Sequence, residues 1–122
     1  MSHLVIIKAQ IKDSHALAAA CTRLGLSQPT QGQAQLFASE ASGYIVQLPG
    51  WQYPAVFDTM SGEAKFDTYN GAWGEQKELD KLLQAYAVEK TRLECRKAGN
   101  TLTEQSLADG SIKLAISVGG AI

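Results

Sequence analysis

Cysteine, histidine and proline are scarce in this chain of 122 residues, which contains two, two and three of them respectively. Cys21 and Cys95 stand alone, without a Cys-x-x-Cys spacing, so we expect free thiols in a reducing compartment rather than disulfides. A zinc site uses about four protein ligands, and here it would need both cysteines together with His3 and His15. We therefore predict neither a metal nor a cofactor.

Long apolar runs and an excess of either charge are also missing. No stretch approaches the roughly 18 residues needed to cross a bilayer, and no basic segment or cleavage site marks a signal peptide. Eleven Lys and Arg oppose 12 Asp and Glu, for a net charge of −1, so the basic field typical of nucleic-acid binders is missing. We predict a cytoplasmic protein that binds neither membranes nor nucleic acids.

The apolar content of 45% and a length typical of one domain predict a single folded unit over residues 1–122. Alternating apolar residues predict a strand over 4–11. A helix should follow, capped by Asp13 or Ser14 and ended by Gly25.

The middle of the chain predicts short strands separated by turns. Residues 27–35 are rich in Gln, Pro, Thr and Gly and predict a loop, whereas 36–38, 44–48 and 55–57 predict strands. The related segments 57–62 and 66–71 end in Ser-Gly and Asn-Gly turn pairs, which favour a β-meander.

The last third predicts a long helix over 75–98 and a hairpin of 101–107 and 111–118 around Asp109-Gly110. Together the elements predict an α+β fold, with an antiparallel sheet of five to seven strands and two helices packed on one face. A ferredoxin-like relative is the first expectation, and a half-covered sheet is compatible with a homo-oligomer.

Catalytic motifs are missing from the chain. It has no phosphate-binding Gly-rich loop, nucleophile elbow or His-Glu-x-x-His motif, and no pair of carboxylates stands out as general acid and base. Asp58 and Asp67 faintly resemble calcium-loop ligands, but the spacing and the terminal bidentate Glu of such a loop are lacking. We predict no catalytic residues and favour a protein that is not an enzyme.

Aromatic residues are concentrated in one segment, since six of the nine lie between positions 51 and 73. Packing in the core and in turns is the simpler interpretation. The functional alternative is an exposed surface for a partner protein or a planar ligand, because Trp and Tyr are favoured at interfaces. The candidate contact residues are Trp51, Tyr53, Tyr69 and Trp73.

The predicted long helix carries a basic cluster that includes Lys90, Arg92 and Arg96. These residues alternate with acidic ones, and Glu89 with Arg92 and Lys90 with Glu94 are spaced for ion pairs. A solvated helix face is the favoured interpretation, and contact with an anion is the alternative.

Both ends of the chain resemble a small family encoded in algal plastids, cyanobacteria and other bacteria. The N-terminal likeness is in Ser2-His3, Ile7-Lys8-x-Gln10-Ile11-Lys12-Asp13 and Leu24-Gly25-Leu26. The C-terminal likeness is in Tyr86-Ala87, Gly99, Glu104 and Asp109-Gly110-Ser111-Ile112-Lys113-Leu114. The order and spacing of these motifs resemble the hypothetical-chloroplast-reading-frame thirty-five family (Ycf thirty-five-like), a domain of unknown function numbered twelve fifty-seven. The chain departs from the plastid pattern at 49–54 and at 118–122.

The resemblance implies no activity, cofactor or catalytic residue, but family members are often encoded near an AAA-type ATPase. Our leading hypothesis is therefore a non-enzymatic accessory or adaptor module that binds a protein partner, with an AAA-type ATPase as the candidate. One alternative is a small-ligand or nucleotide binder that combines aromatic stacking with the basic cluster. The other is a minimal enzyme that uses His3 or a carboxylate.

Overall fold

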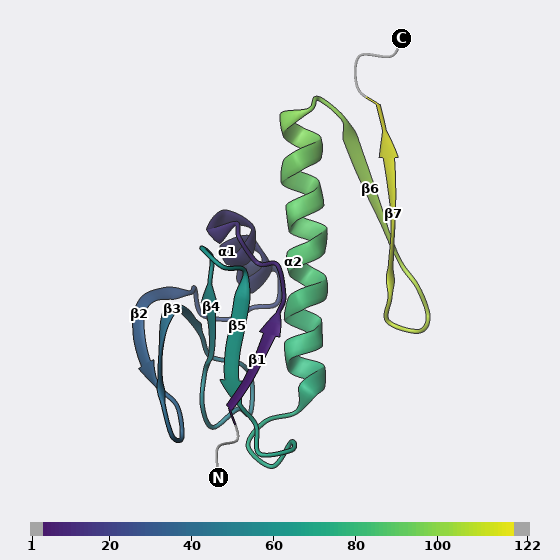
Figure 1. The fold of residues 1–122 in the computed structure, drawn as a ribbon. Coiled ribbons are helices and arrows are strands. Elements are labelled where there is room, and N and C mark those ends of the chain that lie inside the picture. Colours follow the sequence, from purple (N-terminus) through teal and green to yellow (C-terminus); the bar gives the residue numbers. More distant parts are fainter. Residues whose placement is uncertain (1–3, 119–122) are drawn as a thin grey trace.

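The computed structural model of the protein describes residues 4–118 (Figure 1). Five strands form the main sheet: β1 (Leu4–Lys8), β2 (Thr30–Gln35), β3 (Glu40–Val46), β4 (Ala55–Asp58) and β5 (Glu63–Asp67). The two helices are α1 (Ser14–Arg23) and α2 (Gln76–Lys97). A separate hairpin follows, made of β6 (Thr101–Ser106) and β7 (Ile112–Ser117).

The main sheet has the strand order β1-β5-β4-β3-β2, and all neighbouring strands are antiparallel. Strands β2 to β5 form a meander, and β1 pairs with β5, so β1 and β2 lie at opposite edges. The predicted α+β class, with two helices on an antiparallel sheet, is confirmed. The connectivity differs from the ferredoxin-like β-α-β-β-α-β pattern, because no strand of this sheet follows α2.

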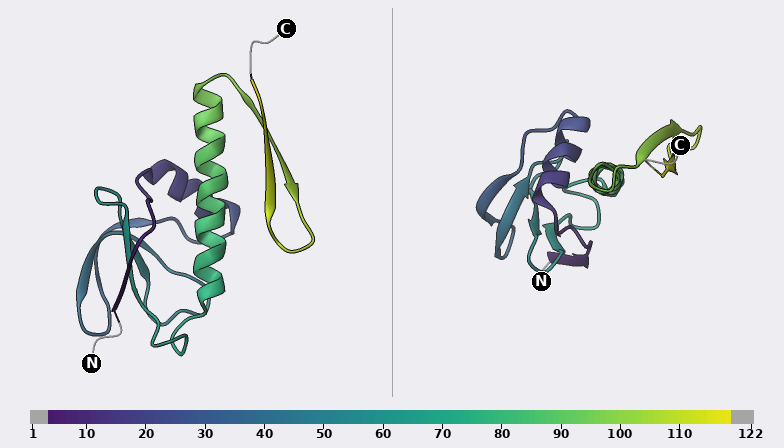
Figure 2. Two further views of the ribbon diagram at one scale, coloured as in Figure 1. Left: turned by 45° about the vertical axis from the view of Figure 1, so that its right-hand side comes forward. Right: turned by 90° about the horizontal axis from the view of Figure 1, so that it is seen from above.

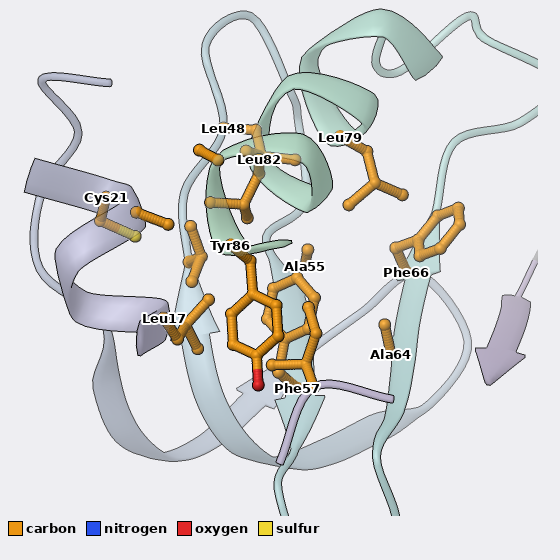
Figure 3. Close-up of a cluster of buried hydrophobic side chains, with 14 of the residues drawn as sticks. Leu17, Cys21, Leu48, Ala55, Phe57, Ala64, Phe66, Leu79, Leu82 and Tyr86 are labelled. Carbon is orange, nitrogen blue, oxygen red and sulfur yellow. The ribbon is translucent and has the colours of Figure 1, made fainter. Parts of the chain in front are cut away.

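The core lies between one face of the sheet and the two helices. Figure 3 shows side chains of α1 and α2 directed toward the small and aromatic side chains of β4 and β5, and the labelled residues are Leu17, Cys21, Leu48, Ala55, Phe57, Ala64, Phe66, Leu79, Leu82 and Tyr86. Strand residues two apart, such as Ala55 and Phe57, reach this face together because side chains alternate along a strand. The hydroxyl oxygen of Tyr86 also accepts hydrogen bonds from the backbone N–H groups of Lys12 and Asp13, at 3.2 and 3.1 Å.

The helix boundaries agree with the predicted caps. The Asp13 carboxylate accepts hydrogen bonds from two backbone N–H groups in the first turn of α1, as an N-cap side chain does. Gly25 has a φ of +72°, and the N–H of Leu26 returns to the carbonyl of Cys21 at 2.8 Å. Gly99 ends α2 with the same left-handed geometry.

Residues 27–38 are arranged differently from the prediction. Residues 30–35, expected in a loop, form the edge strand β2, because their backbone groups pair with β3 although most side chains on both faces are exposed. Residues 36–38, expected as a strand, enter a turn that the N–H of Leu36 and the carbonyl of Ser39 close at 2.7 Å. Leu36 turns inward to a small apolar cluster with Ala41 and Val56.

The hairpin of β6 and β7 is confirmed, with Gly110 in the predicted turn at a φ of +89°. It lies beside α2 on the side away from the sheet, as the view from above shows (Figure 2). Neither apolar cluster of the main body includes a residue of β6 or β7. Glu104 attaches the hairpin to the main body through ion pairs with Arg23 and Arg92.

Candidate functional site

The aromatic segment divides into buried rings and rings at the surface. Trp51 belongs to the buried group, with 5% of its surface exposed. Its indole Nε1–H donates to the carbonyl of Glu75 at 3.0 Å, and its ring lies 5.6 Å from that of Phe66. Trp51, a candidate contact residue in the sequence, is therefore a core residue in the structure, since its ring fills space under the start of α2.

The surface rings form one cluster, which we call the aromatic patch: Phe37, Tyr53, Tyr69 and Trp73. Trp73 is at its centre, with ring centroids 4.9 Å from Phe37, 5.4 Å from Tyr53 and 4.9 Å from Tyr69. The Tyr69 and Trp73 rings are stacked, whereas Tyr53 meets Trp73 edge to face. Half of the Phe37 surface and 45% of the Tyr69 surface are exposed. The structure thus brings together three of the four predicted aromatic candidates.

The loop that carries Tyr69 and Trp73 is held by backbone hydrogen bonds. The carbonyl of Thr68 accepts the N–H groups of Gly71 and Trp73, at 3.0 and 2.9 Å. The Trp73 carbonyl in turn accepts the N–H of Gln52 at 2.8 Å, which ties the loop to the segment before β4. Asn70-Gly71 does form a turn, but the turn leads toward α2 rather than into a further strand. These bonds define the backbone from which the Trp73 side chain projects.

Phe37 is the patch residue that the sequence did not indicate. It lies 30 positions or more before Asp67 and the rest of the loop, in a segment predicted as a strand, and a single Phe beside Leu36 is an ordinary core pattern. The turn after β2 instead directs Phe37 toward Trp73. Its backbone N–H donates to the Oδ2 atom of Asp67 at 2.8 Å.

Asp67 is a charged residue in an almost completely buried position, with 1% of its surface exposed. Its Oδ2 atom accepts the Phe37 N–H, but its Oδ1 atom has no hydrogen-bond partner. The hydroxyl of Ser39, two residues after Phe37, is also buried without a partner. Buried polar atoms in proteins are nearly always hydrogen-bonded, so two exceptions at one turn set this place apart.

The predicted anion-contact residues are placed away from the aromatic patch. Lys90 contacts the carboxylates of Asp13 and Glu94, at 3.1 and 2.9 Å, and Arg92 is paired with Glu104. Arg96 is exposed at the C-terminal end of α2, beside a groove shared with β6. The patch adjoins the other end of α2, about 20 Å from Lys90 at 1.5 Å per helical residue. The structure does not join the rings and the basic residues in one site.

The possible metal ligands do not gather in the part of the chain that the structure describes. Among residues 4–118, no three His, Cys, Asp or Glu residues are close enough to hold a metal ion. Asp58 instead accepts the N–H of Met60 at 3.0 Å, and this hydrogen bond keeps the pKa of Asp58 below its usual 3.8. Both cysteines are unpaired and buried, and burial raises the pKa of Cys21 to about 11. His3, which the minimal-enzyme alternative would use, lies outside the described residues.

No protein-family model, curated protein or solved structure matches the chain. Neither helix of the described residues is both long and apolar enough to cross a membrane.

Proposed function

We propose that the chain is a non-enzymatic accessory module that binds a partner protein through the aromatic patch. The observation that carries this proposal is the gathering of four rings from three separate segments at one place, where Phe37 and Tyr69 are exposed and Tyr53 and Trp73 are half-buried. Large aromatic side chains contribute much of the energy of protein interfaces, because they bury a large area and lose few rotamers on binding.

The rigidity of the loop supports the same function. Thr68 and Gln52 hold the backbone around Trp73 in place before any partner arrives. A preformed surface loses less conformational entropy on binding than a mobile one does. A stacked ring pair, as in Tyr69 and Trp73, also offers a broad flat contact rather than a deep pocket, which suits a protein partner.

A small-anion or nucleotide site receives less support. Such a site would combine rings with basic side chains, yet Lys90 and Arg92 contact carboxylates of the same chain. A minimal enzyme also receives little support, because the Ser39 hydroxyl and the Asp67 carboxylate beside the patch are not hydrogen-bonded to each other as a nucleophile and its base would be. The resemblance to the Ycf thirty-five-like family stays a prediction, and it makes an AAA-type ATPase the first partner to test.

The experiment is quantitative capture of partners from the source cells with a tagged chain. We expect the Tyr69→Ala and Trp73→Ala variants each to capture at least about tenfold less of a specific partner than the unmodified chain does. Met60→Ala is the matched control, because Met60 is 91% exposed but lies on the turn between β4 and β5, outside the patch. Circular dichroism should show that all three variants are folded. Equal recovery by the patch variants and the control would overturn the proposal.

A further inference from the structure

The buried carboxylate beside the aromatic patch suggests which chemical group the partner contributes. Asp67 and Ser39 each keep a buried polar atom without a hydrogen bond. Both belong to the same place, since Asp67 bonds to Phe37 of the turn that Ser39 closes. Leaving such atoms unpaired destabilises the folded chain, and a charged group is costlier to leave unpaired than a neutral one.

Two segments of the aromatic patch are hydrogen-bonded to Asp67 or to the residue that follows it. Phe37 is held by its hydrogen bond to Asp67 Oδ2. Trp73 is held by Thr68, the residue that follows Asp67 in the chain. Asp67 therefore lies where the segments that carry Phe37 and Trp73 meet, and the centroids of these two rings are 4.9 Å apart.

The Asp67 carboxylate lies beside the aromatic patch, and a flat cation can both donate hydrogen bonds to a carboxylate and stack on aromatic rings. A guanidinium group carries five N–H donors and stacks on aromatic rings, whereas an ammonium is a more strongly hydrated point charge. The rings of the patch contact one another, so they leave no enclosed cage for a bulky quaternary ammonium. A guanidinium needs only a ring face and the carboxylate oxygen.

We propose that an arginine side chain of the partner enters beside Phe37, stacks on the aromatic patch and donates hydrogen bonds to Oδ1 of Asp67 and the hydroxyl of Ser39. This inference rests on the proposed function, because it names the group that the patch receives. Phe37 is the residue beside which the arginine enters, because its side chain is half exposed and its backbone N–H is bonded to Asp67. Its ring must rotate to admit the guanidinium, while its backbone bond to Oδ2 is kept.

The test is an NMR titration of the ¹⁵N-labelled chain with acetyl-arginine amide. The amide resonance of Phe37 reports on the carboxylate and the indole resonance of Trp73 reports on the rings. We expect saturable shifts of both resonances. Acetyl-citrulline amide, which has nearly the same shape without the charge, should bind at least about tenfold more weakly, since hydrogen bonds to charged groups are the stronger ones. Acetyl-lysine amide should be intermediate.

The variant that isolates the carboxylate is Asp67→Asn, which keeps the size of the side chain. We expect it to reduce the arginine affinity by at least about tenfold while the fold is retained. Ser39→Ala is the second variant, and it removes the hydroxyl without touching the buried charge. If the Asp67→Asn variant does not fold, the Ser39→Ala variant decides the test, and we expect its affinity for acetyl-arginine amide to be at least about threefold lower than that of the unmodified chain.

Equal binding of arginine and citrulline amides, or an unchanged titration in both variants, would overturn the inference. That failure is distinguishable from failure of the proposed function. If Trp73→Ala loses the captured partner but Asp67→Asn and Ser39→Ala retain it, the patch binds protein without an arginine. If none of the three variants loses the partner, the proposed function itself is wrong.

Discussion

Gly74 and Trp51 provide the sharpest test of how the core supports the aromatic patch. A Cβ atom on Gly74 would lie 2.6 Å from the Cγ and Cδ2 atoms of the indole, so the ring must withdraw by about 0.8 Å to reach an ordinary contact of 3.4 Å. The ring has little freedom to do so, because it is buried against Phe66 and bonded to the carbonyl of Glu75. We therefore expect Gly74→Ala to strain the junction between the loop and α2.

The magnitude follows from two opposing effects. Overfilling a packed site lowers the free energy of unfolding by about 1–3 kcal/mol. Replacing glycine by alanine restricts the unfolded chain, which raises the free energy of unfolding by about 0.4–1 kcal/mol. The backbone of Gly74 is outside the left-handed region, so alanine itself is allowed there. The net loss in the free energy of unfolding should be about 1–2 kcal/mol. Urea titration followed by circular dichroism measures it, as a lower midpoint with an unchanged slope.

A double-mutant cycle identifies the indole as the cause. In a Trp51→Leu background the shorter side chain can rotate away from the new methyl group. The same Gly74→Ala change should then cost less than about 0.5 kcal/mol, a coupling of about 1 kcal/mol between the two positions. An equal cost of Gly74→Ala in both backgrounds would refute the packing argument.

Three further predictions concern the rest of the described chain. Partial burial raises the pKa of Asp13, but hydrogen bonds from Lys90 and from backbone N–H groups outweigh it, so the pKa lies below 3.8. The carboxylate therefore stabilises the fold above about pH 4, and this contribution is lost as the pH falls through the lowered pKa. Asp13→Asn, which keeps an N-cap side chain, should lower stability by up to about 1 kcal/mol at pH 7 and by less near pH 2; a gap in urea midpoints that does not change with pH would contradict this. Cys21 and Cys95 are buried, and the pKa of Cys21 is about 11, so both thiols should react with Ellman's reagent at least about 100-fold more slowly in the native protein than in urea. Fast native labelling would show that α1 or α2 opens readily. A chain that ends at Gly99 should unfold cooperatively with a loss of about 2 kcal/mol or less, because no member of either apolar cluster belongs to the hairpin. Loss of the helical circular dichroism signal in this truncated chain would show that the hairpin is needed for the core.

The sequence predicted the fold best where local signals and tertiary contacts agree. Asp13, Gly25 and Gly99 act at helix ends through bonds within a few residues, so their roles are visible in the local pattern. Strand β2 was missed because its Gln-rich residues have no apolar face, and only pairing with β3 makes them a strand. The first strand ends at Lys8 rather than at residue 11, because Gln10 has a φ of +58°, which no local signal indicates.

The candidate site was predictable in part. The concentration of rings between 51 and 73 correctly indicated Tyr53, Tyr69 and Trp73 as members of one cluster. It also indicated Trp51, because a tryptophan in a turn-rich segment can lie in the core or at the surface. The hydrogen bond to the Glu75 carbonyl and the close packing of the indole against Gly74 place Trp51 in the core, and both depend on where α2 begins in space. Phe37 and Asp67 are joined by a hydrogen bond across 30 positions, which a single sequence does not reveal.

The two tryptophans therefore have different but dependent roles. Trp51 donates a hydrogen bond to the Glu75 carbonyl from within the core, while Trp73, two residues before Glu75, lies half-buried at the centre of the aromatic patch. Any change that moves the Trp51 indole shifts the backbone on which Trp73 is mounted, so loss of binding in a Trp51 variant would not identify Trp51 as a contact residue. Only a variant such as Tyr69→Ala, whose ring is 45% exposed and outside the core cluster, separates contact with a partner from support of the loop. For the same reason the NMR shifts of Phe37 and Trp73 have to be compared with the unfolding free energy of each variant before they are interpreted as binding.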